Sequence, residues 1–176
     1  EKKKDKEKQH LLKQLISPFI LRRTKAEVLD ELPEKTELIV PVELSEEEMA
    51  IYENIRTRTL SGLQSEKINP IEALMALTKL RQAACSPELI DKHLTIPSSK
   101  IRVFLELVSE LKENKHRALV FSQFTSFLAL VRQALDKAGI EYLYLDGSVP
   151  AAQRKKLVET FQNGDMPLFL ISLKAG

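Results

Sequence analysis

The chain has 176 residues, of which 43% are hydrophobic and 30% are charged, and its formal net charge is +2. This length suits one domain of ordinary size, and this hydrophobic content is enough to form a hydrophobic core, so we do not expect the whole chain to be disordered. The charge balance by itself argues neither for nor against a nucleic-acid partner. A single cysteine, Cys85, excludes an intrachain disulfide and favours a reducing, intracellular environment.

The amino-terminal residues are charged rather than apolar. The chain opens on EKKKDKEKQH, which is unlike a signal peptide, and residues 1–9 favour a solvated helix end or a frayed terminus over a nucleic-acid arm. Residues 11–16 then give one short apolar helical stripe, which stops at Ser17-Pro18. No apolar run in the chain approaches the roughly 20 residues that span a bilayer, so we expect no membrane partner.

Two capping boxes and one proline mark helix starts in the first half of the chain. In residues 24–27 and again in residues 45–48, a threonine or serine stands three positions before a glutamate. This pattern is a capping box and predicts a helix start. A further helix is predicted to start at Pro70 and to end near residues 85–87. The acidic residues 46–48 fit a helix start favoured by the helix dipole better than a catalytic role.

One strand is predicted within this mainly helical part. Residues 36–44 alternate apolar side chains with polar or mixed neighbours, and Pro41 confines such a strand to a sheet edge or a bulge. We therefore expect residues 1–97 to form a mainly helical segment with one edge strand.

From residue 98 the pattern changes to alternating helices and strands. Ser98-Ser99 is predicted to cap a helix, and Gly139 and Gly164 are predicted to end the two later helices. Those helices are expected to start at Thr125 or Ser126 and at Ser148-Val-Pro150. The short apolar strands are predicted at residues 117–121, 142–145 and 168–171. The first strand is a short apolar run and not an alternating one, which suits a strand covered on both faces. The alternation predicts a parallel α/β sheet over residues 98–176.

Polar groups follow each of these strands. The three loops are Ser122 to Thr125, Asp146 to Ser148 and Ser172 to Gly176. Because parallel strands end at the same sheet edge, we expect the loops to lie together, where their hydroxyl, amide, lysine and helix N-terminal groups suit phosphate contacts. For Thr125 and Ser148, helix capping is at least as good an explanation. Gln123 and Lys174 do not cap, so a phosphate contact is favoured for them.

Several kinds of catalytic site find no support in the sequence. It contains no GxxxxGK[ST] loop for nucleotide phosphates, and its scattered histidines and single cysteine argue against a metal site. No pair of carboxylates can be assigned to acid–base chemistry. Because ligands of open parallel sheets bind beyond the strand ends and the sequence stops just after a strand, we expect a fragment of a longer protein.

Five blocks resemble, in order and with similar spacing, segments of the Swi/Snf-family ATPases, which are superfamily 2 helicase-like motors. The blocks are PFILRRTKAEVLDELPEKTE (18–37), LRQAACSPEL (80–89), SSKIRVFLEL…HRALVFSQFTSFLALVRQAL (98–135), YLYLDGSVPAAQRKKLVETFQ (142–162) and LFLISLKAG (168–176). The third is similar to helicase motif IV with its leading helix, and the fifth to the first half of motif V. Ser86 stands where a histidine is common in the family.

The resemblance implies the front part of the second motor lobe. Residues 1–97 would be its opening segment with a helical insertion, and residues 98–176 would be a truncated RecA-like lobe of the P-loop NTPase type. ATP and Mg²⁺ are then expected in the parent protein, bound mainly by a first lobe, and we expect this chain alone to be inactive. The implied partners are double-stranded DNA, bound through its phosphates without sequence preference, and the first motor lobe of the same parent. The implied location is intracellular, in the nucleoid or cytoplasm of a prokaryote or the nucleus of a eukaryote.

The resemblance also assigns roles to individual residues. The expected DNA contacts are Ser122, Gln123, Asp146, Gly147, Arg154, Ser172 and Lys174. Arg154 would either contact phosphate or pack its helix. Gly176 would face the ATP cleft, and Arg22 and Arg23 would hold the helical insertion or pair with nearby acids at the surface. No catalytic residue is assigned, because motif VI, with its arginines, is absent from the sequence. The other interpretation is a non-catalytic α/β interaction module with a motor-like fold.

Overall fold

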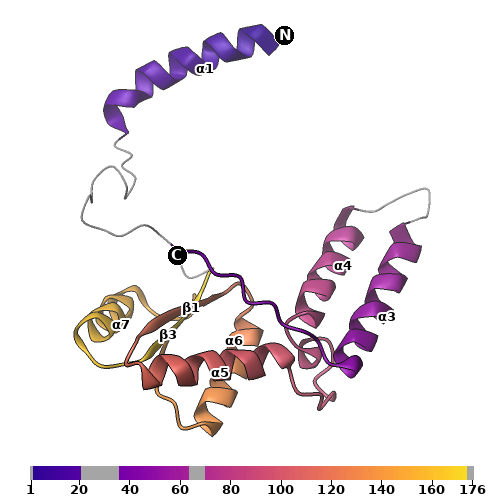
Figure 1. Cartoon of the computed structure of the whole chain (residues 1–176). Helices are drawn as coiled ribbons and strands as arrows, with labels where there is room; N and C mark the ends of the chain where they lie inside the picture. Colours follow the sequence, from indigo (N-terminus) through magenta and orange to yellow (C-terminus); the bar gives the residue numbers. More distant parts are fainter. Residues whose placement is uncertain (1, 21–35, 64–69, 174–176) are drawn as a thin grey trace. The chain divides into compact units, whose positions relative to one another are not determined.

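The computed structural model describes residues 2–20, 36–63 and 70–173, and the chain divides into two compact units, Glu1–Val40 and Pro41–Gly176. Within the first unit, helix α1 (Lys2–Ile16) is followed by a short 3₁₀ turn, η1 (Ser17–Phe19) (Figure 1). The helix ends before Pro18 as predicted, because proline disfavours a helical conformation at the residue before it. The capping box predicted at residues 24–27 lies outside the described residues.

The strand predicted at residues 36–44 is wrong. This segment contains neither strand nor helix, and the side chains of Leu38 and Ile39 are 85% and 90% exposed. An apolar alternation makes a strand only where another strand supplies hydrogen-bond partners, and Pro41 offers no backbone N–H. The boundary between the two compact units falls in this segment. The domain boundary expected between residues 97 and 98 stays a prediction.

Helices α3 (Glu46–Leu63) and α4 (Pro70–Ala83) form a helical hairpin in which the two helices lie side by side (Figure 1). The capping box at the start of α3 is confirmed. The Ser45 N–H donates to Glu48 Oε2 at 2.9 Å, and the Glu48 N–H donates to Ser45 Oγ at 3.2 Å. Helix α4 starts at Pro70, as predicted, and a 3₁₀ turn, η2 (Pro87–Leu89), follows it.

The remaining elements form a parallel α/β sheet, which confirms the predicted fold class. They are α5 (Ser99–Glu113), β1 (Ala118–Ser122), α6 (Thr125–Lys137), β2 (Tyr142–Leu145), α7 (Ala151–Asn163) and β3 (Leu168–Ser172). The strand order is β1-β3-β2, and β3 pairs in parallel with both neighbours. The predicted cap of α5 is confirmed, because Ser98 Oγ accepts the Ile101 N–H at 3.3 Å. Gly139, with a φ of +66°, follows the end of α6 as predicted.

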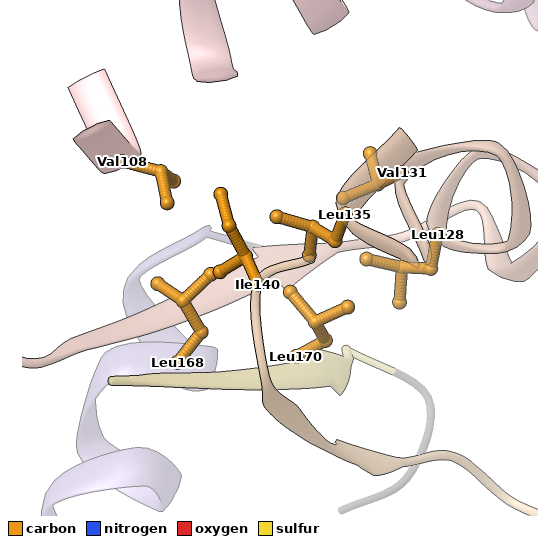
Figure 2. Close-up of a cluster of buried hydrophobic side chains, with 7 residues drawn as sticks. All are labelled: Val108, Leu128, Val131, Leu135, Ile140, Leu168 and Leu170. Carbon is orange, nitrogen blue, oxygen red and sulfur yellow. The ribbon is translucent and has the colours of Figure 1, made fainter. Parts of the chain in front are cut away.

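Helices pack on both faces of the sheet. On one face, side chains of α5, α6 and β3, together with Ile140 from the link between α6 and β2, form the main core, which Figure 2 shows: Val108, Leu128, Val131, Leu135, Ile140, Leu168 and Leu170. On the other face, Leu157 and Phe161 of α7 pack with Leu145 and Phe169. The central strand β3 is thereby covered on both faces.

The expectation that the first strand is covered on both faces is wrong. Leu119 and Phe121 of β1 are 51% and 54% exposed, whereas Ala118 and Val120 pack against the main core. The reason is that the α7 side chains pack over β2 and β3 and leave this face of β1 uncovered.

A buried carboxylate joins the helical hairpin to α5. The Glu48 side chain, which is 1% exposed, also accepts the Ser99 N–H at 3.0 Å and the Ser99 hydroxyl. Next to it, the Ser98 hydroxyl donates to the Cys85 carbonyl at 2.7 Å. Burial by itself raises the pKa of Glu48, but the hydrogen bonds from Ser99 and Ser45 outweigh burial, and the pKa is lowered. One carboxylate therefore holds the starts of two helices together in its charged form.

Replacement of Glu48 should destabilise the fold far more than replacement of its neighbour. Glu48→Ala leaves the buried N–H of Ser99 and the partly buried N–H of Ser45 without their acceptor, so we expect the free energy of unfolding to fall by about 2–4 kcal/mol. The matched control is Glu47→Ala, which removes an exposed carboxylate from the same helical turn and should change the free energy by less than about 0.5 kcal/mol. Urea unfolding at neutral pH measures both values.

The pH dependence gives a second readout for the same residue. The folded pKa of Glu48 is lowered, so its stabilisation is fully present above the unfolded carboxyl pKa of about 4.3 and is lost as the pH falls through the folded value. The Glu48→Gln variant has no carboxylate at this position, so its free energy of unfolding should not show the loss at low pH that protonation of Glu48 causes. Equal losses in the Glu48→Ala and Glu47→Ala variants, or an unchanged acid profile in Glu48→Gln, would contradict this account.

Candidate nucleic-acid interface

The three strands end at one edge of the sheet, as predicted. The pairing register sets Ser122 opposite Ser172 and Leu145 opposite Ile171, so the strands finish within one residue of one another. We call the segments that follow them, residues 123–124, 146–150 and 173, the strand-end loops. Lys174 and Gly176, which belong to the same predicted site, lie outside the described residues, as do Arg22 and Arg23.

The loop after β1 is held by Ser122. Its hydroxyl oxygen accepts the Phe124 N–H at 3.2 Å, and its carbonyl accepts the Leu173 N–H at 2.9 Å, which joins the loops after β1 and β3. The predicted capping of α6 by Thr125 or Ser126 is wrong: Phe124 is the N-cap residue and makes no side-chain cap. Because the helix already begins at Thr125, both hydroxyls lie within its first turn instead of before it.

Gln123 is in contact with an arginine from the helical hairpin. Arg81 Nη2 donates to Gln123 Oε1 at 2.5 Å, and the Arg81 guanidinium lies 5.8 Å from the centre of the Phe124 ring. Sequence reasoning missed Arg81 as a site residue because the contact joins positions 42 residues apart. The one sequence signal for Arg81 was its position in the LRQAACSPEL block. That block contains no residue of the predicted site.

The loop after β2 is built around Asp146. Its Oδ1 accepts the Ser148 N–H at 2.9 Å and the Ser148 hydroxyl at 2.5 Å, and its Oδ2 accepts the Tyr144 hydroxyl at 2.8 Å. The Ser148 side chain is the largest cause of the lowered pKa of Asp146, followed by Tyr144. Ser148 therefore does not cap α7, whose N-cap residue is Pro150. The Asp146 carboxylate braces its own loop.

Arg154 closes the same loop from the first turns of α7. Its Nε donates to the Val149 carbonyl at 2.9 Å and its Nη2 to the Gly147 carbonyl at 3.4 Å. Of the two roles expected for Arg154, these bonds support packing, and they also place its positive charge at the strand-end loops. The structure thus brings Asp146, Gly147 and Arg154 to one loop, and their contact with DNA stays a prediction.

Accessibility differs among the predicted contact residues. Gly147 is exposed, Ser122, Gln123, Asp146 and Arg154 are partly buried, and the Ser172 side chain is only 1% exposed. A DNA contact from Ser172 would therefore require the end of β3 to open. Among the described residues, no three His, Cys, Asp or Glu side chains are grouped to hold a metal ion. No helix in this part of the chain is long and apolar enough to cross a membrane.

Acidification should release the loop after β2. Because the folded pKa of Asp146 is lowered, its bonds to Ser148 and Tyr144 are present above the usual carboxyl pKa of about 3.9 and are lost as the pH falls below that value. We expect the backbone amide signal of Ser148 in ¹H–¹⁵N spectra to titrate below about pH 3.9. Tyr144→Phe, which removes one donor, should move the midpoint upward. A midpoint at or above the usual value in the unmodified chain would show that these bonds do not hold the loop.

Comparison with known proteins identifies the family. The model of the SNF2-related domain matches residues 1–89, and that of the helicase conserved C-terminal domain matches residues 99–176. A chromodomain-helicase-DNA-binding protein 1-like of Danio rerio is 35% identical over 94% of this chain and 17% of its own length. An uncharacterized ATP-dependent helicase of Mycoplasma pneumoniae is 36% identical over 100% of this chain and 17% of its own length.

Solved structures agree with the sequence relatives. The Sulfolobus solfataricus SWI2/SNF2 ATPase core in complex with dsDNA superposes with a TM-score of 0.75 and 28% identity, over 95% of this chain and 37% of that one. The chain thus spans well under half of the length of each of these three proteins. With the SNF2-related model covering residues 1–89 and the helicase C-terminal model covering most of the remainder, this chain belongs to the SNF2 (Swi/Snf) family of helicase-like proteins.

Proposed function

We propose that the chain is part of the second motor lobe of a DNA-dependent ATPase that translocates along double-stranded DNA. Its strand-end loops would contact the phosphate backbone. One observation carries the proposal: parallel pairing brings Gln123, Gly147 and Arg154 to a single edge of the sheet. The S. solfataricus protein of similar fold is described in complex with double-stranded DNA, which supports duplex DNA as the ligand class.

The groups at this edge suit phosphate better than bases. An amide, a hydroxyl, exposed backbone and a guanidinium are the usual partners of phosphate oxygens, and such contacts fix position without reading sequence. In the proposal Ser122, Gln123, Gly147 and Arg154 contact or line the backbone. Asp146 shapes the loop, because its carboxylate is held by Ser148 and Tyr144. Lys174 would add a positive charge after β3, whereas Ser172, whose side chain is buried, would reach DNA only if the end of β3 opened.

ATP and Mg²⁺ are assigned to a partner lobe of the same parent protein. The sequence has no GxxxxGK[ST] loop, and among the described residues no three His, Cys, Asp or Glu side chains are grouped to hold a metal ion. We propose that Gly176 faces the cleft between the lobes, that Arg22 and Arg23 hold the helical insertion, and that this chain alone turns over no ATP.

The proposal predicts weak DNA binding that depends on salt and not on sequence. Each phosphate contact adds about 0.9 to the slope of log affinity against log salt concentration, so two or three contacts give a slope of about −2 to −3. The dissociation constant should be about 10⁻⁴ M or weaker at physiological salt. Fluorescence anisotropy with two unrelated duplexes over a salt series measures both quantities.

Charge variants at the two ends of the sheet locate the contact. Arg154→Gln should flatten the slope by about one unit. The control Lys112→Gln removes a positive charge from the last turn of α5, just before β1 begins, and should leave the slope unchanged. A strong preference between the duplexes, or flattening by Lys112→Gln alone, would contradict the proposal. Absence of binding would favour the alternative, a non-catalytic interaction module.

A further inference from the structure

The contact between Arg81 and Gln123 links the helical hairpin directly to the candidate DNA interface. Arg81 lies in the last turn of α4, and its Nη2 reaches the Gln123 side-chain oxygen at 2.5 Å. The same guanidinium lies over the Phe124 ring at 5.8 Å. One side chain of the hairpin therefore engages both residues of the loop between β1 and α6.

The chemistry of the two side chains sets the orientation of the glutamine. An amide has an acceptor oxygen at one end and two N–H donors at the other, whereas a guanidinium has donors only. Arg81 can therefore satisfy only the oxygen of Gln123. The NH₂ group of Gln123 then remains available as a hydrogen-bond donor. A phosphate oxygen is an acceptor and requires such a donor.

The contact is not needed to attach the hairpin. Glu48 already binds Ser99, and Ser98 already binds the Cys85 carbonyl, both in buried or partly buried surroundings. The Arg81–Gln123 bond is exposed by comparison, and exposed bonds of this kind add little to stability. The main effect of the Arg81–Gln123 bond is therefore to orient the Gln123 side chain at the strand-end loops.

We propose that Arg81 is a positioning residue for the DNA interface. By holding the oxygen of Gln123, it presents the amide NH₂ to the phosphate backbone and ties that contact to the position of the helical hairpin. The inference rests on the proposed function, because it takes duplex DNA as the ligand at Gln123. The inference goes beyond the proposed function because it assigns a DNA-binding role to α4, a helix of the hairpin.

A double-mutant cycle on the full 176-residue chain tests this role, with duplex affinity read by fluorescence anisotropy. We expect Arg81→Ala and Gln123→Ala each to weaken binding by about fivefold, the worth of one hydrogen bond. If Arg81 acts through Gln123, the double variant should bind no more weakly than Gln123→Ala. Additive losses would instead show an independent phosphate contact by Arg81 and overturn the inference.

Two further variants separate position from charge. Arg81→Lys keeps the positive charge but lacks the planar guanidinium that stacks on Phe124. We expect it to bind as weakly as Arg81→Ala, and recovery of full affinity would overturn the inference. The matched control is Arg56→Ala, which removes an exposed arginine of the same hairpin that pairs with Glu53 and should leave affinity unchanged.

The side-chain amide signals of Gln123 distinguish failure of this inference from failure of the proposed function. Without DNA, Arg81→Ala should shift these ¹H–¹⁵N signals and lower their heteronuclear NOE, since the oxygen loses its partner. Unchanged signals, together with normal DNA binding by the unmodified chain, would overturn the inference alone. No DNA binding by the unmodified chain would overturn the proposed function, and the DNA role of Arg81 with it.

Discussion

Parallel pairing of β1 and β2 on the central strand β3 decides where the candidate contact residues lie. Because all three strands run the same way, their following loops meet at one edge, even though they come from segments about 25 residues apart along the chain. The main core between α5, α6 and β3 fixes this geometry. Glu48 then attaches the helical hairpin to the start of α5, which brings Arg81 to the same edge.

The features that sequence reasoning identified correctly are those with a local signal. The capping box of Ser45 and Glu48, the proline that starts α4, the Ser98 cap and Gly139 each depend on residues within a few positions of one another. The strand at residues 142–145 has its predicted limits, because apolar residues cluster there between clear turn signals. The helices that link successive strands indicated that the strands run in parallel. The parallel direction correctly predicted that the strand-end loops lie at one edge of the sheet.

The features that were missed depend on partners far away in the sequence. Residues 36–44 have the alternation of a strand but no strand to pair with, and the apolar run of β1 does not reveal that α7 leaves one face of β1 uncovered. Thr125 has the residue type of a helix cap, but α6 starts at this residue and its N-cap is Phe124. The second role of Glu48, as the acceptor for Ser99, joins positions 51 residues apart. Such contacts follow from tertiary packing and leave no local pattern.

The most direct test of the account maps the DNA-binding surface residue by residue. An unlabelled duplex titrated into ¹⁵N-labelled chain at low salt should shift the backbone amides of residues 122–126 and 146–149 and the side-chain amide of Gln123. Residues 113–117 and 139–141, at the opposite ends of the strands, should stay unchanged. Shifts centred on residues 113–117 and 139–141, with the strand-end loops unaffected, would contradict the claim that this edge of the sheet binds DNA.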